Sequence, residues 1–301
     1  MKHSTLGRTG LEVSEVGFGA APLGIPHYLE KWDPVADDSR RSAVHALHHA
    51  LERGINYWDT AAGYGDGLSE EVVGQALKGR RDRVVIATKV GGEISAESVI
   101  AGAEASLRRL GVDSIDIFQF HGGHYEDGED DRILGPGLDA MHQLREDGKI
   151  RFIGITAEGS TPALERMIAT GSFDTLQICY NFCYQHPCNL TNPRAGTIWR
   201  AKEQNMGVIT MRTLTSGLFQ RTMAAVGGAD APGFDANAFL LNYVLSNPLV
   251  DVALVGMRRV EEVDRNVQVA ETAERLDLEA LHHRFPLSPV AGADRKEGED
   301  R

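Results

Sequence analysis

Apolar positions along the chain recur in two patterns that follow one another, one typical of helices and one typical of buried strands. Residues 38–54 carry apolar side chains every three or four positions, with Asp38 or Ser39 as the expected N-cap, and end on a glycine. The β-prone run 55–58 follows directly. Residues 95–111 repeat this arrangement, with a serine as the N-cap and a glycine as the stop. The pattern therefore predicts alternating helices and strands.

Eight short apolar runs are candidates for strands, and helical segments separate most of them. Alternating units of this kind predict a parallel sheet buried on both faces, and eight of them in about 250 residues match a closed (β/α)8 TIM barrel. The first residues lie outside this count and predict a β-hairpin that turns at residues 8–10. The expected strands are residues 16–19, 55–58, 83–89, 114–120, 151–156, 175–180, 207–212 and 250–256.

No low-complexity linker interrupts the chain between Thr5 and Pro286. We therefore expect one domain over residues 1–288, followed by a polar and disordered tail at 289–301. A doubly wound sheet is the structural alternative, but no G-x-G-x-x-G run opens a helix after any of the expected strands.

Composition narrows the possible partners. The 301 residues are 42% hydrophobic and carry a formal net charge of -12, which would repel both a nucleic-acid backbone and an anionic membrane. No apolar run approaches the roughly 20 residues that a membrane helix needs, and the first residues lack the plan of a secretion signal. We expect a cytoplasmic protein with a small-molecule substrate; the sequence does not indicate an oligomeric state.

The three cysteines, Cys179, Cys183 and Cys188, lie close together, with His186 among them. An odd number of cysteines argues against a disulfide framework. A metal site is the alternative, but the spacing matches no strong zinc pattern. We expect small, partly buried thiols and no metal.

Ionisable side chains end three successive expected strands. These are Asp59, Lys89 and His121, and Tyr64 lies on the loop after the first of these strands. Taken singly, each has an ordinary explanation as a turn former, a solvated lysine head or a packed ring. In a parallel barrel, however, the carboxyl ends of all strands meet at one face, where active sites lie. We therefore expect these four groups to converge.

Such a set allows a particular acid–base chemistry. The Lys89 ammonium would lower the pKa of the Tyr64 phenol, and Asp59 would hold the lysine in place and keep it charged. His121 would orient a carbonyl oxygen or share its proton. Tyr64 then acts as a general acid toward an oxygen that gains negative charge.

Several stretches spread along nearly the whole chain match one known family in order. They are TLGRTGLEVSEVGFGAAPLG, GINYWDTAAGYGDGLSEEVVGQAL, VVIATKVG, SLRRLGVDSIDIFQFH, GKIRFIGIT, LQICYN and LVGMRRVEEVDRNV. By these stretches the chain resembles the aldo-keto reductase superfamily. The resemblance implies a (β/α)8 barrel whose N-terminal hairpin plugs one end, and a catalytic tetrad at Asp59, Tyr64, Lys89 and His121. It also implies a nicotinamide cofactor, mostly NADPH, and reduction of aldehydes or ketones.

The chain departs from the family where the nicotinamide would bind. The usual Ser-Asn pair is Thr156-Ala157 here, whereas Gln177 is present, and Met211 stands where many members stack a tyrosine. The resemblance places cofactor contacts at Gly19, Ala20, Asp59, Thr156, Gln177, Met211, Arg212, Leu214, Gly256, Met257, Arg258, Glu262 and Asn266.

At the adenosine end, the resemblance implies that Arg258 grips the 2′-phosphate and that Asn266 contacts adenine. Glu262 stands where many NADPH-preferring members carry an arginine, and a carboxylate there would repel a phosphate. In other branches of the family this position contacts the adenine amine. We expect NADPH, with NADH also possible.

Two long segments, residues 23–38 and 122–137, are the expected substrate walls. They contain Tyr28, Trp32 and Tyr125. Ordinary surface packing of these loops is the alternative. His124 is either a second polar group in the pocket or a loop histidine.

The predicted function is an NADPH-dependent carbonyl reductase, or an alcohol dehydrogenase in the reverse direction. In either direction a hydride passes between nicotinamide and the substrate carbon, and Tyr64 exchanges the proton. The alternatives are a cofactor-binding regulatory subunit of the same fold and a barrel isomerase or lyase that works without nicotinamide.

Overall fold

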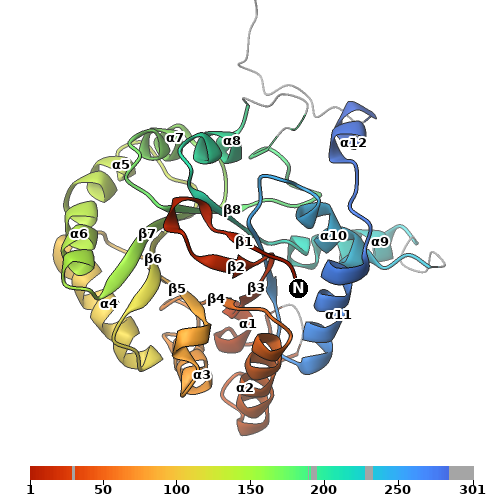
Figure 1. The fold of residues 1–301 in the computed structure, drawn as a ribbon, viewed down its shortest axis with the longest axis horizontal. Coiled ribbons are helices and arrows are strands. Elements are labelled where there is room, and N and C mark those ends of the chain that lie inside the picture. Colours follow the sequence, from red (N-terminus) through yellow and green to blue (C-terminus); the bar gives the residue numbers. More distant parts are fainter. Residues whose placement is uncertain (29–30, 189, 191–194, 228–232, 285–301) are drawn as a thin grey trace, which may run out of the picture.

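Eight parallel strands form a closed barrel in the computed structural model, which describes residues 1–301 except 29–30, 189, 191–194, 228–232 and 285–301 (Figure 1). Neighbouring strands in the chain are neighbours in the barrel, and the last pairs with the first. The predicted (β/α)8 barrel is confirmed. Its strands are β3 (Val16–Gly19), β4 (Tyr57–Asp59), β5 (Val85–Val90), β6 (Ile115–His121), β7 (Ile150–Ala157), β8 (Thr175–Cys179), β9 (Gly207–Met211) and β10 (Val252–Gly256).

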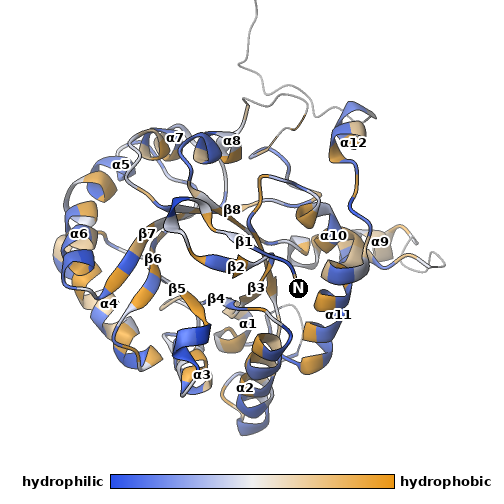
Figure 2. Cartoon of the chain, viewed as in Figure 1, coloured by the Kyte–Doolittle hydropathy of each residue, from blue (hydrophilic) through white to orange (hydrophobic). Residues whose placement is uncertain are grey.

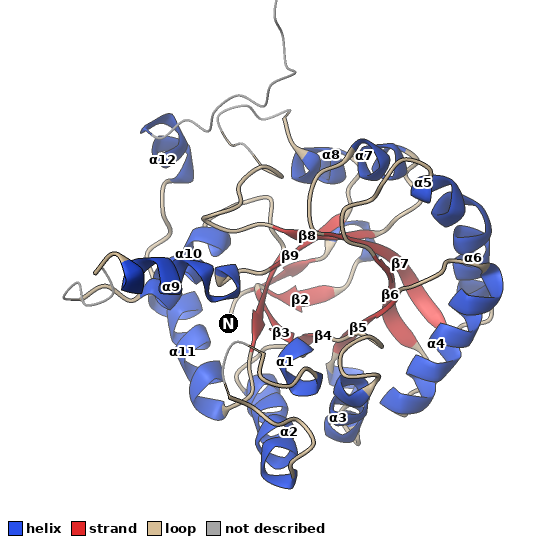
Figure 3. Ribbon diagram, turned by 180° about the vertical axis from the view of Figure 1, so that it is seen from behind, coloured by secondary structure: helices blue, strands red, loops and turns tan. Residues whose placement is uncertain are grey.

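Helices surround the barrel (Figure 3). The helices that follow the strands are α2 (Asp37–Glu52), α3 (Leu68–Leu77), α4 (Ala96–Leu110), α6 (Leu138–Glu146), α7 (Pro162–Ala169), α8 (Thr197–Glu203), α10 (Ala236–Leu245) and α11 (Val260–Thr272). Shorter elements are α1 (Ala21–Gly24), α5 (Glu129–Arg132), a π-helical turn (Ile133–Gly137), α9 (Leu218–Ala225) and α12 (Leu278–Arg284). None of the helices in the described ranges has the length and apolarity to cross a bilayer.

The ends of the helices follow local signals. Ser95 caps α4 by accepting a hydrogen bond from the Ser98 amide, and Gly111 ends the helix at a φ of 66°. The expected cap of α2 at Asp38 or Ser39 is wrong: the helix begins at Asp37, and its N-cap is Ala36. The two aspartates lie in the first turn instead, where their charge favours the helix dipole.

The N-terminal hairpin covers the amino-terminal end of the barrel. Strands β1 (His3–Thr5) and β2 (Glu12–Ser14) pair antiparallel across a 3-10 turn at Gly7–Thr9. A Cβ on Gly7 would lie 2.2 Å from the backbone nitrogen of Gly207, so only glycine allows the turn to lie this close to β9. The hairpin's apolar side chains, Leu6, Leu11 and Val13, pack with those inside the barrel.

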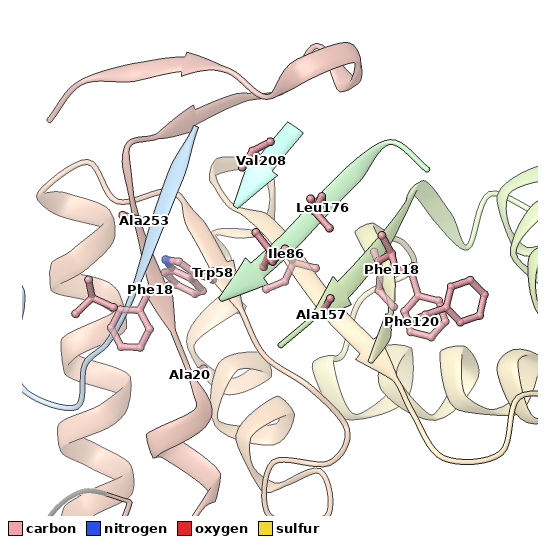
Figure 4. Close-up of a cluster of buried hydrophobic side chains, with 14 of the residues drawn as sticks. Phe18, Ala20, Trp58, Ile86, Phe118, Phe120, Ala157, Leu176, Val208 and Ala253 are labelled. Carbon is pink, nitrogen blue, oxygen red and sulfur yellow. The ribbon is translucent and has the colours of Figure 1, made fainter. Parts of the chain in front are cut away.

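Side chains of the strands alternate between two environments. The side chains that point out of the barrel, including Phe18, Trp58 and Phe118, form a core with the surrounding helices (Figure 4). The helices turn their apolar residues toward the barrel (Figure 2). The inward set is apolar near the hairpin and becomes polar toward the carboxyl ends of the strands. That change of polarity marks the candidate site.

The expected tail at residues 289–301 lies outside the described residues. The single domain expected over residues 1–288 stays a prediction.

Candidate active site

The four expected catalytic residues lie together at the carboxyl ends of β4, β5 and β6. Asp59 and His121 are the last residues of their strands, and Lys89 is the last but one of β5. Asp59, Tyr64 and His121 line one cavity of about 350 Å³. Lys89 lies beneath them with 1% of its surface exposed.

The Lys89 ammonium connects these groups. Its Nζ donates to both carboxylate oxygens of Asp59 at 2.7 and 2.8 Å, to the Thr60 carbonyl at 2.7 Å and to the Tyr64 hydroxyl at 3.4 Å. Burial disfavours its charge and is the largest single effect, but Asp59 and Tyr64 together outweigh it, and the pKa of Lys89 is raised. Burial also raises the pKa of Asp59, and the lysine opposes that rise.

The expected lowering of the Tyr64 pKa is wrong for this arrangement. Burial raises the pKa of the phenol, and the Asp59 carboxylate adds to the rise, so Lys89 only partly compensates. Tyr64 is therefore protonated at neutral pH and can donate a proton. Its ring lies edge-on to His121, with 5.7 Å between the ring centroids.

His121 is neutral at ordinary pH. Burial lowers the pKa of its ring to about 4, and the nearby Lys89 charge adds to the effect. A neutral imidazole can donate one hydrogen bond to an oxygen that lies between it and Tyr64.

Gln119 is a member of this network that the sequence analysis missed. Its Nε2 lies 3.4 Å from Asp59 Oδ1 and 3.2 Å from Gln177 Oε1, and the side chain is completely buried. It therefore connects the lysine–aspartate pair to the glutamine expected at the nicotinamide amide. The signal was present, because a residue two positions before His121 on a strand faces the same side.

Most residues that the resemblance assigns to the cofactor line the cavity. They are Gly19, Asp59, Gln177, Met211, Arg212, Leu214, Gly256 and Arg258. Four other assigned residues are buried and are not among the lining residues: Ala20, Thr156, Met257 and Asn266. The Thr156 hydroxyl accepts from the Gly122 amide at 3.0 Å, and the next residue, Ala157, packs in the outer core (Figure 4).

Glu262 lies at the N-terminus of α11. Its Oε2 accepts from the backbone amides of Arg258 at 2.5 Å and Arg259 at 3.1 Å. Arg258 Nη1 donates to the Tyr28 carbonyl at 3.2 Å. The carboxylate thus holds the backbone amides that the expected phosphate would approach.

Of the residues expected in the substrate walls, the structure brings only Tyr28 to the cavity among the part of the chain that it describes, and the substrate walls stay a prediction. Trp32 is buried instead beneath the guanidinium groups of Arg258 and Arg259, each 5.4 Å from its ring. Tyr125 is also buried and donates its hydroxyl to the Thr156 carbonyl at 2.9 Å, while His124 is exposed; among the described residues neither lines the cavity. The sequence showed that these residues lie on loops after the carboxyl ends of β3 and β6, but it could not show which way their side chains point.

Two charged residues of the cavity wall carry a contact that the sequence did not predict. Arg212 Nη2 lies 2.7 Å from Glu158 Oε1, and both side chains line the cavity. Glu158 had no signal in the sequence, because it follows the end of β7 and its partner lies 54 positions away.

A larger depression, of about 810 Å³, lies at the amino-terminal end of the barrel, between the hairpin and the first residues of β4, β5 and β6. Its buried carboxylate, Asp116, is held by Arg81 and Arg151 at 2.8 and 2.6 Å. Active sites of such barrels lie at the opposite face, at the carboxyl ends of the strands, so we do not assign catalysis to these paired charges.

Within the described ranges, no three histidine, cysteine or acidic side chains lie together as metal ligands.

Comparison with known proteins agrees with this geometry. The sequence model of the Aldo/keto reductase family matches residues 15–237. An L-galactose dehydrogenase from Arabidopsis thaliana is 33% identical, over 91% of this chain and 89% of the relative. An uncharacterized oxidoreductase from Bacillus subtilis is 26% identical, over 93% of this chain and 94% of the relative.

Solved structures match as well. An aldo-keto reductase from Bacillus halodurans in its holo form has a TM-score of 0.75 and 25% identity, over 95% of this chain and 96% of that one. An aldo-keto reductase from Klebsiella pneumoniae in complex with NADPH has a TM-score of 0.72 and 26% identity, over 96% of this chain and 98% of that one. Because the family model covers most of the barrel and all four converging residues, this chain belongs to the aldo/keto reductase family.

Proposed function

We propose that the protein is an NADPH-dependent oxidoreductase that reduces a small aldehyde or ketone to the alcohol, or catalyses the reverse oxidation. The observation that supports this most is the connected set of Asp59, Lys89 and Tyr64 beside a neutral His121. Asp59, Tyr64 and His121 line one cavity, and Lys89 is buried beneath them.

The cavity wall suits a nicotinamide dinucleotide. The Gln177 side chain lines the cavity, accepts from Gln119 at 3.2 Å, hydrogen-bonds Asp59 and lies 4.0 Å from the Met211 sulfur. Because an amide offers two donors and two acceptor positions, it can bind a carboxamide as well. The cavity continues past Gly19 and Gly256 to Arg258, whose guanidinium suits a phosphate. The Klebsiella pneumoniae structure with NADPH supports this choice of cofactor. Glu262 is the feature that opposes a 2′-phosphate.

When bound, NADPH supplies a hydride to the carbonyl carbon. Tyr64 donates its proton to the carbonyl oxygen, so that the hydride on carbon and this proton on oxygen complete the alcohol. Lys89 stabilises the phenolate that Tyr64 leaves behind, and Asp59 holds Lys89. His121 donates a hydrogen bond that orients the oxygen.

The test is consumption of NADPH by the purified protein with a panel of aldehydes, ketones and sugars, together with oxidation of the matching alcohols. We expect turnover that requires Tyr64. Tight NADPH binding without turnover of any compound in either direction would instead favour a regulatory subunit of the same fold.

A further inference from the structure

The Glu158–Arg212 ion pair lines the cavity but takes no part in the proposed hydride and proton transfer, although the resemblance places a cofactor contact at Arg212. Its charged atoms lie 2.7 Å apart, and the two side chains keep 30% and 45% of their surface exposed. Both residues line the same cavity as Tyr64 and His121. Polar atoms of the pair are thus accessible from the place where the substrate reacts.

The backbone around Arg212 holds its side chain in this position. Arg212 has a φ of 56°, a left-handed conformation that is uncommon for a residue with a side chain. Its carbonyl accepts hydrogen bonds from Asn181 Nδ2 at 3.0 Å and from the Thr215 amide at 2.7 Å. Thr215 and Ser216, which follow, also have positive φ values. Strained residues that are fixed in this way are typical of functional sites.

Charges in the cavity wall cancel. The described lining residues with a charge are Asp59, Glu158, Arg212 and Arg258, and each contacts a group of opposite charge. A carboxylate or phosphate on the substrate, beside the reacting carbon, would have to displace Glu158 from Arg212 or Asp59 from Lys89. The wall therefore favours an uncharged substrate.

The pair itself can still bind hydroxyl groups. A carboxylate with one oxygen on a guanidinium keeps lone pairs that accept from O–H groups, and the guanidinium keeps N–H groups that donate to hydroxyl oxygens. Ser216, whose hydroxyl lies 3.4 Å from Arg212 Nη1, and Tyr28 add two more hydroxyls to the same wall. Neighbouring hydroxyls on one substrate offer both a donor and an acceptor to such a surface.

We propose that Glu158 and Arg212 select an uncharged, polyhydroxylated substrate, with hydroxyls on the carbons next to the one that reacts. The proposal rests on the proposed function and narrows its substrate class. The hydroxyls are bound and not changed, since the hydride and the Tyr64 proton go to the carbonyl group alone. Similarity to a dehydrogenase that is named for a sugar, L-galactose, supports the same class.

The experiment compares two three-carbon aldehydes, glyceraldehyde and propionaldehyde, in the native protein and in Glu158→Gln. Gln keeps the size of the side chain but removes the charge that holds Arg212. Glyceraldehyde carries two hydroxyls that propionaldehyde lacks, and we expect the native protein to prefer it in kcat/KM by at least about tenfold, the scale of one hydrogen bond to a charged group. In Glu158→Gln that preference should fall by about tenfold, mainly through KM, while propionaldehyde changes by no more than about twofold.

The matched control is Glu71→Gln, which breaks the exposed ion pair of Arg40 and Glu71 on α2 and α3 and should change neither substrate. NADPH binding is measured for every variant by fluorescence titration. If Glu158→Gln lowers kcat/KM equally for both aldehydes and also weakens NADPH binding, the ion pair acts on the cofactor and the inference is overturned. Unchanged preference in Glu158→Gln would overturn it as well. If the native protein binds NADPH but reduces neither aldehyde nor any compound of the wider panel, the proposed function itself fails.

Discussion

Lys89 Nζ lies 2.7 and 2.8 Å from the two carboxylate oxygens of Asp59, and both side chains are almost completely buried inside the barrel. A buried ion pair costs the solvation of both charges, so the pair alone adds little to stability. Its value lies in placing a fixed ammonium beneath the Tyr64 hydroxyl.

Removal of one partner should be costly. Lys89→Met leaves the Asp59 carboxylate buried without its counter-charge, and we expect the free energy of unfolding to fall by about 3–5 kcal/mol. Urea denaturation measures this value. The double variant Asp59→Asn with Lys89→Met should lose less free energy of unfolding than the sum of the two single losses, because the pair acts as a unit. Additive losses would contradict the coupling.

Tyr64→Phe keeps the ring and removes the proton. Carbonyl reduction should slow by at least ~10²-fold in kcat, the scale of general acid catalysis, with little change in the Kd of NADPH. Tyr57→Phe is the control, because it removes another buried phenolic hydroxyl of the barrel, one that does not line the cavity. Near-normal turnover by Tyr64→Phe would remove Tyr64 from the mechanism.

The lowered pKa of His121 predicts that the folded protein loses stability as the pH falls below about 6.5. Since the folded pKa of about 4 lies below the usual 6.5, the unfolded chain binds the extra proton between these values. This residue's contribution to stability is therefore present above pH 6.5 and decreases as the pH falls toward 4. NMR titration of the ring protons should give a midpoint near 4, and one near 6.5 would show that the ring is not desolvated as described.

Glu262 should weaken the binding of NADPH. Because its carboxylate occupies the amides at the start of α11, Glu262→Gln keeps the cap but removes the like charge, and NADPH should bind on the order of tenfold more tightly. The affinity for NADH should not change. The neighbouring Glu261→Gln serves as the control, and equal changes for the two cofactors would show that Glu262 does not face the 2′-phosphate.

The cysteines should differ in reactivity. Cys179 and Cys188 are buried, and burial raises the pKa of each thiol to about 11, whereas Cys183 is exposed. We expect a disulfide reagent to modify one thiol quickly in the folded protein, and none in Cys183→Ser. Activity should survive a strong chelator, and one equivalent of bound metal by elemental analysis would contradict the expectation of structural thiols.

Local pattern was sufficient for most of the fold. The eight strands, the N-terminal hairpin and the cap and stop of α4 each follow from apolar periodicity or from a single residue with a marked backbone preference, such as Ser95 or Gly111. The convergence of Asp59, Lys89 and His121 followed in turn, because parallel strands bring all their carboxyl ends to one face.

Side-chain direction and burial were decided only by the tertiary structure. Trp32 and Tyr125 lie on the expected loops, but their side chains are buried. Glu158 follows β7 and Arg212 follows β9, and the fold brings the two side chains into contact. The raised pKa of Tyr64 depends on how much solvent the folded barrel removes from the phenol, which outweighs the charge of Lys89. Sequence alone determined that Asp59, Lys89 and His121 reach the barrel mouth, since the residue at which an apolar strand ends is a local property. The surroundings of each group come from contacts between distant segments, and these form only when the barrel closes.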